Sequence, residues 1–362
     1  MYLERLDLYV IEIPRREEFS ITRGTSRSVT QVLVNLTSRE ADGWGAASPN
    51  SVTGESVESI TDALMVAWED VKKKETDIGV IEGALDSHAS RAPAATAALS
   101  MAAWDLYGHV EDLPVHALLA PGKGEIVTDY SLGLGSIEQT LSRAQDADSK
   151  GFAAFKVKVG VDPTEDAKKV RALRQRFPEA RLWVDGNQGY DTAALLKFAE
   201  GVAGCGVEFV EEPTRSLAEA SAVRKTYPLC ADESVHTPED AERVASAGLA
   251  DMINIKVMKA GTLTRAWKIA SVMKKYSMTG MVGCFGESSI SIAAGVHLAL
   301  AAEPIRVTDL DSPFMLVDDV AVGLPFEKGK YHATRHPGLG VEVVEKKLMN
   351  YVAGADGKGA SI

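Results

Sequence analysis

Cysteine is scarce in this chain, and long apolar runs are missing from it. Only three of the 362 residues are cysteines, Cys205, Cys230 and Cys284. Their odd number and wide spacing exclude a disulfide framework, and their apolar surroundings predict reduced core residues rather than metal ligands or nucleophiles. No apolar run reaches the roughly 18 residues that a membrane-spanning helix needs. We therefore expect no disulfides and no transmembrane helix.

Basic residues are also in short supply, with 39 Lys and Arg against 51 Asp and Glu and a net charge of -12. Such an acidic surface argues against nucleic acid and anionic membranes as partners. The first residues, MYLERLDLYVIEIPRREEF, alternate like a β-strand and carry acidic side chains, which does not suit a secretion signal. We therefore expect a cytoplasmic protein that binds neither nucleic acid nor membranes.

The first third of the chain predicts a small α+β unit. Apolar residues alternate in two strand-like runs and then recur with helical spacing in two others: 2–12 and 29–37, followed by 55–72 and 91–108. The polar stretch around Arg23 and the segment 48–54 are expected to be mobile loops. We predict an N-terminal domain over residues 1–120, to which the polar segment 320–362 returns.

From residue 125 to residue 318, short apolar strands alternate with amphipathic helices. Strands are expected at 126–132, 153–159, 181–185, 207–211, 229–232, 251–256, 279–284 and 305–309. Helices are expected at 137–150, 163–176, 192–203, 238–247, 262–275 and 288–301. Because strand and helix alternation implies parallel strands, about eight such units predict an α/β fold of the (β/α)-barrel type. A doubly wound open sheet is the competing fold.

Two lysines interrupt one of these apolar strands, in the sequence FKVKVG at 155–160. Successive strand side chains point to opposite faces, so Lys156 and Lys158 share one face. An unpaired ammonium is costly to bury, and partners of opposite charge are therefore expected beside them. Lys256 lies in another apolar strand, four strands further along the chain. In an eight-stranded barrel these amines would face a central cavity from opposite sides.

Three successive strands end in an acidic residue, namely Asp185, Glu211 and Asp232. In a parallel barrel these ends meet at one mouth, where barrel active sites lie. Three convergent carboxylates repel one another unless a cation lies between them, and an all-oxygen set favours a hard metal such as Mg²⁺. The alternative is that Asp185 and Asp232 cap the helices that follow. The neighbouring Glu212 and Glu233 point the other way and are expected to support the site from behind.

Together these features resemble the enolase superfamily, in its muconate lactonizing enzyme subgroup. The resemblance rests on the Lys-x-Lys strand, the three acidic strand ends, the Asn-Ile-Lys256 strand and the sequence GCFGESS at 283–289. It covers essentially the whole chain. It implies a modified TIM barrel with an N-terminal α+β capping domain.

The resemblance also implies roles for these residues. The three acidic strand ends would bind Mg²⁺, while Lys158 and Lys256 would act as acid and base on the two faces of a carboxylate substrate. Removing a proton next to a carboxylate builds a dianion, whose charge Mg²⁺ and Lys156 would neutralise. Glu287 would lie at the substrate pocket. A lysine base that works near neutral pH also needs a lowered pKa.

Asp309 and Asp311, at the end of the last predicted strand, point to a substrate that carries an amine. They are two residues apart and face the same way, so their carboxylates can clamp an ammonium group. This Asp-x-Asp resembles the dipeptide epimerases, in which it holds the free α-amino group. The stretch 19–27 resembles the loop that presents an arginine to a glutamate side chain in Ala-Glu epimerases. Arg23 is the better candidate for that arginine and Arg27 the other.

The sequence thus predicts a Mg²⁺-dependent dipeptide epimerase, an isomerase that transfers a proton at the α-carbon of the C-terminal residue of a dipeptide such as L-Ala-D/L-Glu. A muconate-type cycloisomerase, an o-succinylbenzoate synthase or an N-acylamino acid racemase is the alternative within the subgroup. A pyridoxal-phosphate barrel racemase and a non-catalytic barrel are the alternatives outside it. The family habit predicts a homo-oligomer. Phe285-Gly286 departs from the usual Met-Ile and bears on side-chain preference.

Overall fold

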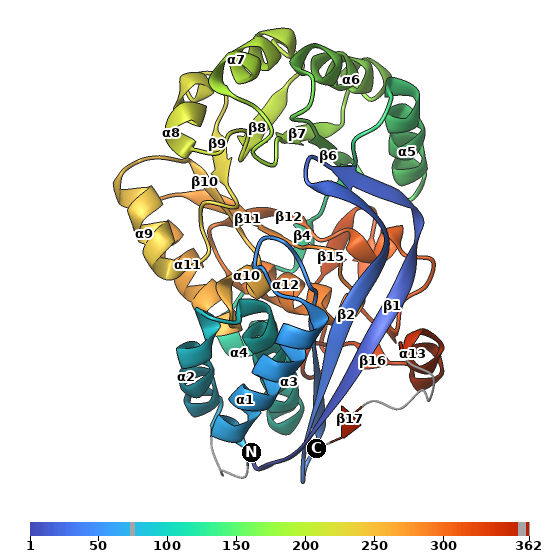
Figure 1. Ribbon diagram of the computed structural model, residues 1–362, viewed down its shortest axis with the longest axis vertical. Coiled ribbons are helices and arrows are strands. Elements are labelled where there is room, and N and C mark those ends of the chain that lie inside the picture. Colours follow the sequence, from blue (N-terminus) through green and yellow to red (C-terminus); the bar gives the residue numbers. More distant parts are fainter. Residues whose placement is uncertain (73–76, 354–359, 362) are drawn as a thin grey trace.

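The computed structural model describes residues 1–72, 77–353 and 360–361. Eight strands form one sheet whose spatial order follows the chain. They are β5 (Tyr130–Leu132), β6 (Ala154–Lys158), β7 (Arg181–Asp185), β8 (Val207–Glu211), β9 (Leu229–Ala231), β10 (Met252–Ile255), β11 (Thr279–Gly283) and β12 (Ile305–Asp309). The sheet curls into a barrel (Figure 1), since a parallel bridge between Thr128 and Thr308 joins β12 to the segment before β5. The predicted barrel is confirmed, and an open sheet is excluded.

Helices cover the outside of the barrel (Figure 1): α5 (Ile137–Ser149), α6 (Pro163–Arg176), α7 (Thr192–Gly201), α8 (Leu217–Ala220), α9 (Pro238–Ser246), α10 (Val257–Ala260), α11 (Leu263–Lys275) and α12 (Ser289–Ala301). Five of them begin at a side chain that accepts a hydrogen bond from the first turn: Ser136, Asp162, Asp191, Thr237 and Thr262. Such caps fix where a helix starts. Because α7 and α9 are capped by Asp191 and Thr237, the alternative that Asp185 and Asp232 are caps is wrong.

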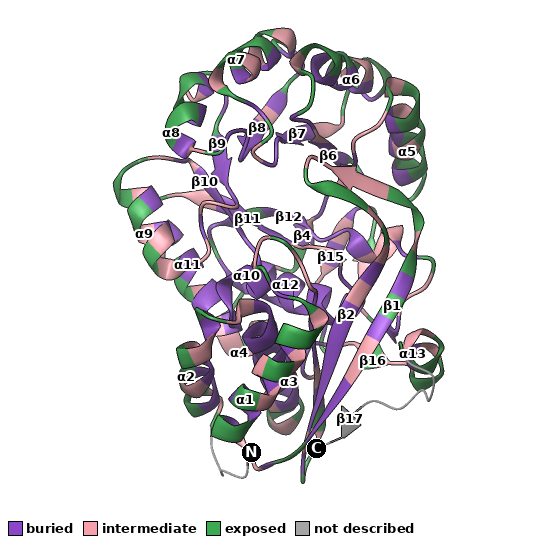
Figure 2. Ribbon diagram, viewed as in Figure 1, coloured by how far each residue is buried: buried purple, intermediate pink, exposed green. Residues whose placement is uncertain are grey.

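The barrel strands alternate between their two faces, as the sequence predicts. Phe155 and Val157 pack into the main core, whereas Lys156, between them, points into the barrel. An apolar layer fills the barrel interior two positions before the polar strand ends, for example Trp183 before Asp185. Figure 2 shows that the barrel strands are largely buried. The polar strand ends therefore lie on top of a sealed apolar layer.

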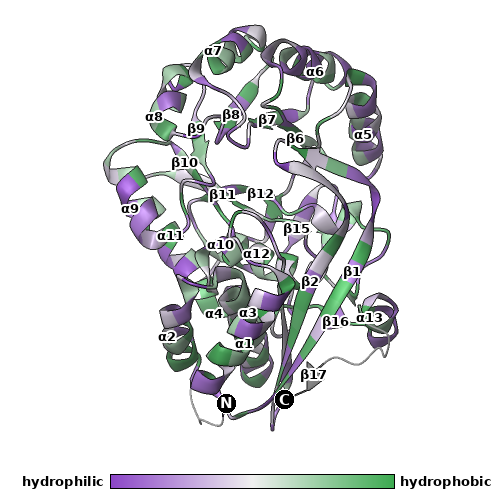
Figure 3. Ribbon diagram, in the orientation of Figure 1, coloured by the Kyte–Doolittle hydropathy of each residue, from purple (hydrophilic) through white to green (hydrophobic). Residues whose placement is uncertain are grey.

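The N-terminal part pairs an antiparallel sheet with helices. Its described elements are β1 (Leu3–Ile21), β2 (Gly24–Ser38), β3 (Asp42–Ala47), α1 (Val57–Val71), α2 (Ile78–Ala89), α3 (Pro93–Glu111) and α4 (Val115–Leu119), with β17 (Ala360–Ser361) added beside β1. The sequence patterns predicted the strands too short and missed α2. The long hairpin β1–β2 reaches up to the barrel mouth (Figure 1) and is more polar toward its tip (Figure 3).

The expectation of a mobile loop around Arg23 is wrong, because strand pairing continues to Ile21 and Gly24. The tip is held by the barrel: the Thr22 hydroxyl donates to the carbonyl oxygen of Asn187 at 3.1 Å. The backbone N–H of Leu134 donates to the carbonyl oxygen of Ser20 at 2.8 Å. These contacts come from distant parts of the chain, and local alternation alone does not reveal them.

The chain after β12 runs back along both parts. It contains β13 (Ala321–Val322), β14 (Phe326–Glu327), β15 (Lys330–His332), β16 (Glu342–Val343) and α13 (Glu345–Tyr351). β15 pairs with β4 (Glu125–Val127), so the expected strand 126–132 is split between β4 and the barrel strand β5. Ala353 donates its backbone N–H to the carbonyl oxygen of Val10 in β1 at 2.7 Å. Throughout the described ranges, no helix combines the length and hydropathy required to cross a bilayer.

Candidate active site at the barrel mouth

Three carboxylates lie together at the carboxyl ends of neighbouring strands. Asp185 is the last residue of β7, Glu211 is the last residue of β8, and Asp232 directly follows β9. All three are buried, with at most 1% exposure. We call them the strand-end cluster.

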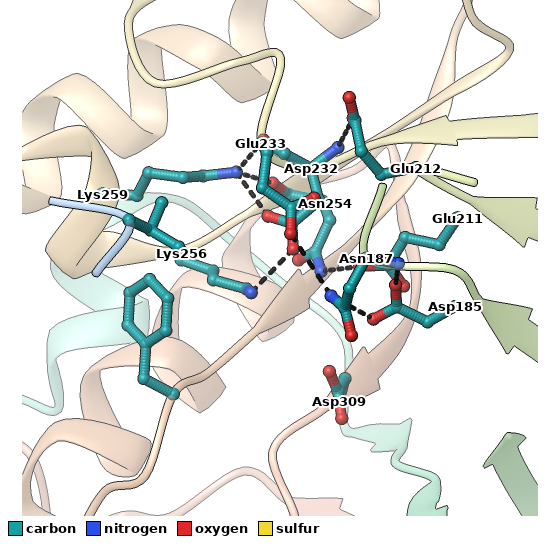
Figure 4. Close-up of polar contacts among 12 residues, drawn as sticks. Asp185, Asn187, Glu211, Glu212, Asp232, Glu233, Asn254, Lys256, Lys259 and Asp309 are labelled. Atoms are coloured by element: carbon teal, nitrogen blue, oxygen red, sulfur yellow. Dashed lines mark hydrogen bonds and ion pairs between the residues drawn. The ribbon is translucent and has the colours of Figure 1, made fainter. Parts of the chain in front are cut away.

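Ammonium groups neutralise the strand-end cluster from several directions. Lys158 Nζ lies 2.6 Å from Asp185 Oδ2, and Lys256 Nζ lies 2.7 Å from Asp232 Oδ2. Lys259 Nζ lies 2.6 Å from the other oxygen of Asp232. Figure 4 shows Lys256 and Lys259 reaching Asp232 from one side, with Asp185 on the other. Paired and hydrogen-bonded charges of this kind can be buried.

The surroundings of this cluster contain oxygen atoms that no donor satisfies. Oδ1 of Asn187, Oε2 of Glu233 and Oδ1 of Asn254 are buried and accept no hydrogen bond. Burial and the neighbouring charge of Asp185 raise the pKa of Glu211 to about 8, although Lys156 acts in the opposite direction. Buried carboxylates together with unsatisfied oxygen donors fit a hard divalent cation such as Mg²⁺.

Lys256 departs from the expectation of a lowered lysine pKa. Burial favours the neutral amine, but the surrounding carboxylates, Asp232 first among them, together outweigh burial and raise the pKa of Lys256. Burial of Asp232 is likewise outweighed, by Lys256 and Lys259, which hold its pKa well below the ordinary value. The expectation counted burial and neighbouring cations but not an ion pair with a site carboxylate.

A second acidic group, the aspartate cluster, consists of Asp129, Asp309 and Asp311. One carboxylate oxygen from each lies within 4.8 Å of the others. The Ser131 hydroxyl donates to Asp309 Oδ1 at 3.0 Å, and its backbone N–H donates to Asp311 Oδ2 at 2.5 Å. The Trp183 indole N–H donates to Asp129 Oδ2 at 2.7 Å. Neutral donors therefore provide most of the hydrogen bonds to this cluster.

The surroundings of the three aspartates shift their pKa values in different directions. Burial and the charge of Asp309 raise the pKa of Asp311 to about 7. Burial, together with Asp309 and Asp311, raises the pKa of Asp129 well above its ordinary value. Burial acts on Asp309 too, but the surrounding lysines, Lys156 first among them, together outweigh burial and lower the pKa of Asp309. The cluster thus has carboxyl groups that a further cation would help to ionise.

Lys156 joins the two clusters. Its Nζ lies 2.7 Å from Asp309 Oδ2, 2.8 Å from Glu211 Oε2 and 3.1 Å from Asp185 Oδ2. The side chain has 0% exposure. The contact of Lys156 with a substrate carboxylate, which the resemblance implied, is replaced here by contacts with three carboxylates of the protein.

The aspartate cluster borders a cavity of about 450 Å³, and the strand-end cluster lies next to this cavity through the lysines that pair with its two aspartates. Lys158 and Lys256 line this cavity, and so do Asp309 and Asp311. The hairpin tip and residues 48–52 supply the wall facing the barrel. The structure thus brings the two predicted acid/base lysines and the predicted ammonium clamp to the wall of one cavity.

The other predicted substrate-binding residues, Arg23, Arg27 and Glu287, differ in burial and in the partners they contact. Arg23 lines the cavity, but its Nη1 lies 2.5 Å from Glu233 Oε1. Arg27 is exposed and pairs with a glutamate of the same hairpin at 2.6 Å. Glu287 is buried, and its carboxylate accepts the backbone N–H of Phe285 at 2.7 Å. Burial raises the pKa of Glu287. Through this hydrogen bond the buried Glu287 side chain stabilises the loop that follows β11.

Cys205, Cys230 and Cys284 are all free, as predicted. Cys205 and Cys230 are buried in the core. Cys284 instead lines the cavity, so the expectation of a core position is wrong for this residue. It directly follows β11, where the barrel opens into the site.

Sequence reasoning missed several polar residues of the site. The only sequence signal for Lys259 is that it is a second lysine in the apolar stretch that follows Lys256. Asn254 stands in a quoted motif, yet its role emerges from its Nδ2, which donates to Glu211 Oε1 at 2.8 Å. Asp129 gave no local signal, because its neighbour Asp309 lies far away in the chain.

Comparison with known proteins finds two family models. Residues 139–347 match the model described as "Enolase C-terminal domain-like". Residues 6–120 match that of the "Mandelate racemase / muconate lactonizing enzyme, N-terminal domain". Together the two matches cover the barrel from α5 onward and the hairpin with its helices.

Individual relatives include enzymes with different substrates. The L-Ala-D/L-Glu epimerase of Clostridium acetobutylicum is 32% identical over 348 residues, which are 92% of this chain and 96% of the relative. The dipeptide epimerase of Methylococcus capsulatus, solved in complex with Mg and the dipeptide L-Arg-D-Lys, is 32% identical with a TM-score of 0.88, covering 95% of this chain and 100% of the other. The N-succinyl Arg/Lys racemase of Bacillus cereus has a TM-score of 0.93 at 26% identity, with 100% of each chain covered.

Proposed function

The chain belongs to the enolase-like family of mandelate racemase and muconate lactonizing enzyme, as a racemase- or epimerase-type isomerase, and from that premise we propose that it is a Mg²⁺-dependent dipeptide epimerase. One observation carries the proposal: two lysines and the Asp309–Asp311 pair border the same cavity. The lysines suit proton exchange at one carbon, and the aspartates suit an ammonium group. A dipeptide offers both, an α-proton beside its carboxylate and a free N-terminus.

The strand-end cluster is proposed to hold Mg²⁺ through Asp185, Glu211 and Asp232. Its all-oxygen donors and the unsatisfied oxygens around it support this assignment. So does the Methylococcus capsulatus relative, which was solved with Mg and a dipeptide. When bound, Mg²⁺ would supply positive charge for the substrate carboxylate, on which negative charge builds as the α-proton leaves.

Lys158 and Lys256 are proposed to move the proton. Each must first leave its carboxylate partner, because Asp185 and Asp232 hold the two ammonium groups away from the substrate carbon. One lysine, as the neutral amine, then takes the α-proton of the C-terminal residue. The other, as the ammonium, returns a proton to the opposite face and inverts the carbon. Two lysines from opposite sides of the barrel support inversion, since a one-base reaction needs only one.

Asp309 and Asp311 are proposed to bind the α-ammonium of the substrate. Ser131 orients both carboxylates through its hydroxyl and its backbone N–H. Lys156 fixes Asp309 and spreads its charge over both clusters. Arg23 could bind the glutamate side chain of L-Ala-D/L-Glu only if its ion pair with Glu233 were broken. We therefore propose dipeptides as the substrate class, with L-Ala-D/L-Glu as one candidate.

The proposal is tested by incubating dipeptides in D₂O with the purified protein. We expect α-deuterium and the second epimer at the C-terminal residue, loss of exchange with EDTA, and recovery with Mg²⁺. N-acetylated versions of the same dipeptides are the control, because they lack the ammonium and should exchange more slowly. Turnover of N-acylamino acids or muconate, without turnover of any dipeptide, would contradict the proposal and favour the other reactions of the subgroup.

A further inference from the structure

Four cationic side chains line the cavity, and they differ in whether a carboxylate neutralises them. Lys158, Lys256 and Arg23 each form an ion pair with a carboxylate of the site. Arg15, in β1, forms no ion pair with any described residue of the chain. A guanidinium at a cavity wall is costly to keep without an anion beside it.

The groups that hold Arg15 are neutral. Its Nε donates to the Ser26 hydroxyl at 2.9 Å, and Nη1 lies 3.8 Å from Sδ of Met315. The guanidinium carbon lies 5.4 Å from the centre of the Phe19 ring. Burial lowers the pKa of Arg15, although a guanidinium still stays charged. Of five N–H donors, one bonds to a hydroxyl oxygen, so donors remain for an anion.

Gly286 provides the space that Arg15 occupies. A Cβ atom at this position would lie 2.8 Å from Nη2 of Arg15 and 2.9 Å from a methyl group of Val29. The Ser48 hydroxyl donates to the carbonyl oxygen of Gly286 at 2.6 Å and fixes this loop. Any larger residue at position 286 would therefore displace the guanidinium. Arg15 and Gly286 form a matched pair in this chain.

Arg15 and Arg23 belong to different ends of the cavity. The backbone of Arg15 forms an antiparallel bridge with Leu316, which follows the aspartate pair closely in the chain. Of the carboxylates around Arg15, Asp311 has the largest effect on its pKa. Arg23 instead contacts Glu233 and feels the charges of the strand-end cluster. A dipeptide whose ammonium lies at Asp309 and Asp311 would thus bring its N-terminal residue toward Arg15.

We propose that Arg15 binds a carboxylate on the N-terminal residue of the substrate, so that the enzyme prefers dipeptides that begin with aspartate or glutamate. The proposal rests on the dipeptide epimerase function, because the ammonium clamp is what places that residue. A planar guanidinium matches a carboxylate with two parallel hydrogen bonds. An N-succinyl amino acid carries a similar carboxylate but leaves the ammonium clamp unused, and it serves as the second arm of the test.

The test measures kcat/KM for three substrates that share one C-terminal residue, Xaa. L-Glu-L-Xaa and L-Gln-L-Xaa differ only in the charge of the first side chain, and N-succinyl-L-Xaa is the third substrate. A charged hydrogen bond predicts a Glu over Gln preference of about tenfold or more. Arg15→Met should reduce the ratio to near one, chiefly through KM, and Arg15→Lys should restore part of it. Gly286→Ala should lower the ratio while the charge is kept.

Arg16→Met is the matched control, because Arg16 is the exposed neighbour of Arg15 and lies outside the cavity wall. It should leave the ratio unchanged. A wild-type ratio near one, or a ratio that survives Arg15→Met, overturns the role of Arg15 even though dipeptides are epimerised. A preference for N-succinyl-L-Xaa over L-Glu-L-Xaa overturns the assignment to the N-terminal residue. Absence of exchange with every dipeptide, in contrast, is a failure of the proposed function itself.

Discussion

The strand-end cluster and the aspartate cluster are built from the same kind of residue and share Lys156, yet they differ in how they are neutralised. In the strand-end cluster every carboxylate has an ammonium within 2.8 Å. In the aspartate cluster Lys156 contacts Asp309, while Ser131 and Trp183 supply neutral donors to the other two. Proximity of carboxylates alone therefore does not fix the charge of a site.

The difference in neutralisation matches a difference in chemistry. Lysines keep Asp185 and Asp232, two of the three carboxylates of the strand-end cluster, ionised, as their lowered pKa values indicate, whereas burial raises the pKa of Glu211. Two such permanent anions are suited to a divalent cation. In the aspartate cluster two of the three carboxyl groups, Asp129 and Asp311, have raised pKa values, and a single additional ammonium would favour their ionised forms.

The largest effect is expected when a lysine of the strand-end cluster is removed. Lys158→Ala or Lys256→Ala should lower epimerisation by about a thousandfold or more, since a positioned acid or base contributes 10²–10⁴-fold and inversion needs both. Asp232 keeps Lys259 as a partner in Lys256→Ala, so the fold should persist. The rate is measured by deuterium exchange, with the exposed Lys275→Ala as control. More than a tenth of the wild-type rate would contradict the two-lysine mechanism.

Removal of the shared cation should affect stability. Lys156→Met leaves buried carboxylates in both clusters without their common partner, and breaking a buried ion pair costs about 3–5 kcal/mol. Urea unfolding measures the loss. Lys168→Met, which breaks an exposed pair with Glu165, is the control and should unfold like the wild type. Equal stability of the two variants would show that Lys156 does not hold the clusters together.

The contrast between the clusters also explains what sequence could predict. The barrel and the strand-end cluster were predictable because their signals are local: polar residues at i and i+2 in apolar strands, and an acid at each strand end. Strands β7, β8 and β12 begin and end at the predicted residues. Alternation within one strand is sufficient to place such side chains on the inner face of the barrel.

The remainder of the site depends on contacts between distant segments. Asp129 meets Asp309 only when the sheet closes, and Arg15 reaches the cavity only because the hairpin leans over the barrel mouth. The sequence pointed to Arg23, but its ion pair with Glu233 is visible only in the fold. No periodic pattern in one segment encodes such pairs.

A moderate effect is expected from Asp311. Its pKa is raised to about 7 by burial and by Asp309, so it loses its charge as the pH falls through 7. Since the ammonium of the substrate binds the ionised form, kcat/KM for dipeptides should decline below about pH 7. Asp311→Asn should lower kcat/KM by roughly 10- to 100-fold and remove this part of the pH dependence. A wild-type profile that is flat between pH 5.5 and 8 would contradict the assignment.

The smallest effect is expected from Asp129→Asn, because burial, Asp309 and Asp311 raise the pKa of Asp129 and favour its neutral form. The amide oxygen can still accept the Trp183 indole N–H, so the free energy of unfolding should change by no more than about 1 kcal/mol. A carboxyl group whose pKa is raised by folding loses stabilising effect as the pH rises from its unfolded value toward its folded value. Urea unfolding at pH 5 and pH 8 should therefore show less decline for the variant than for the wild type. A larger decline in the variant would mean that Asp129 is ionised, and that the aspartate cluster is neutralised much as the strand-end cluster is.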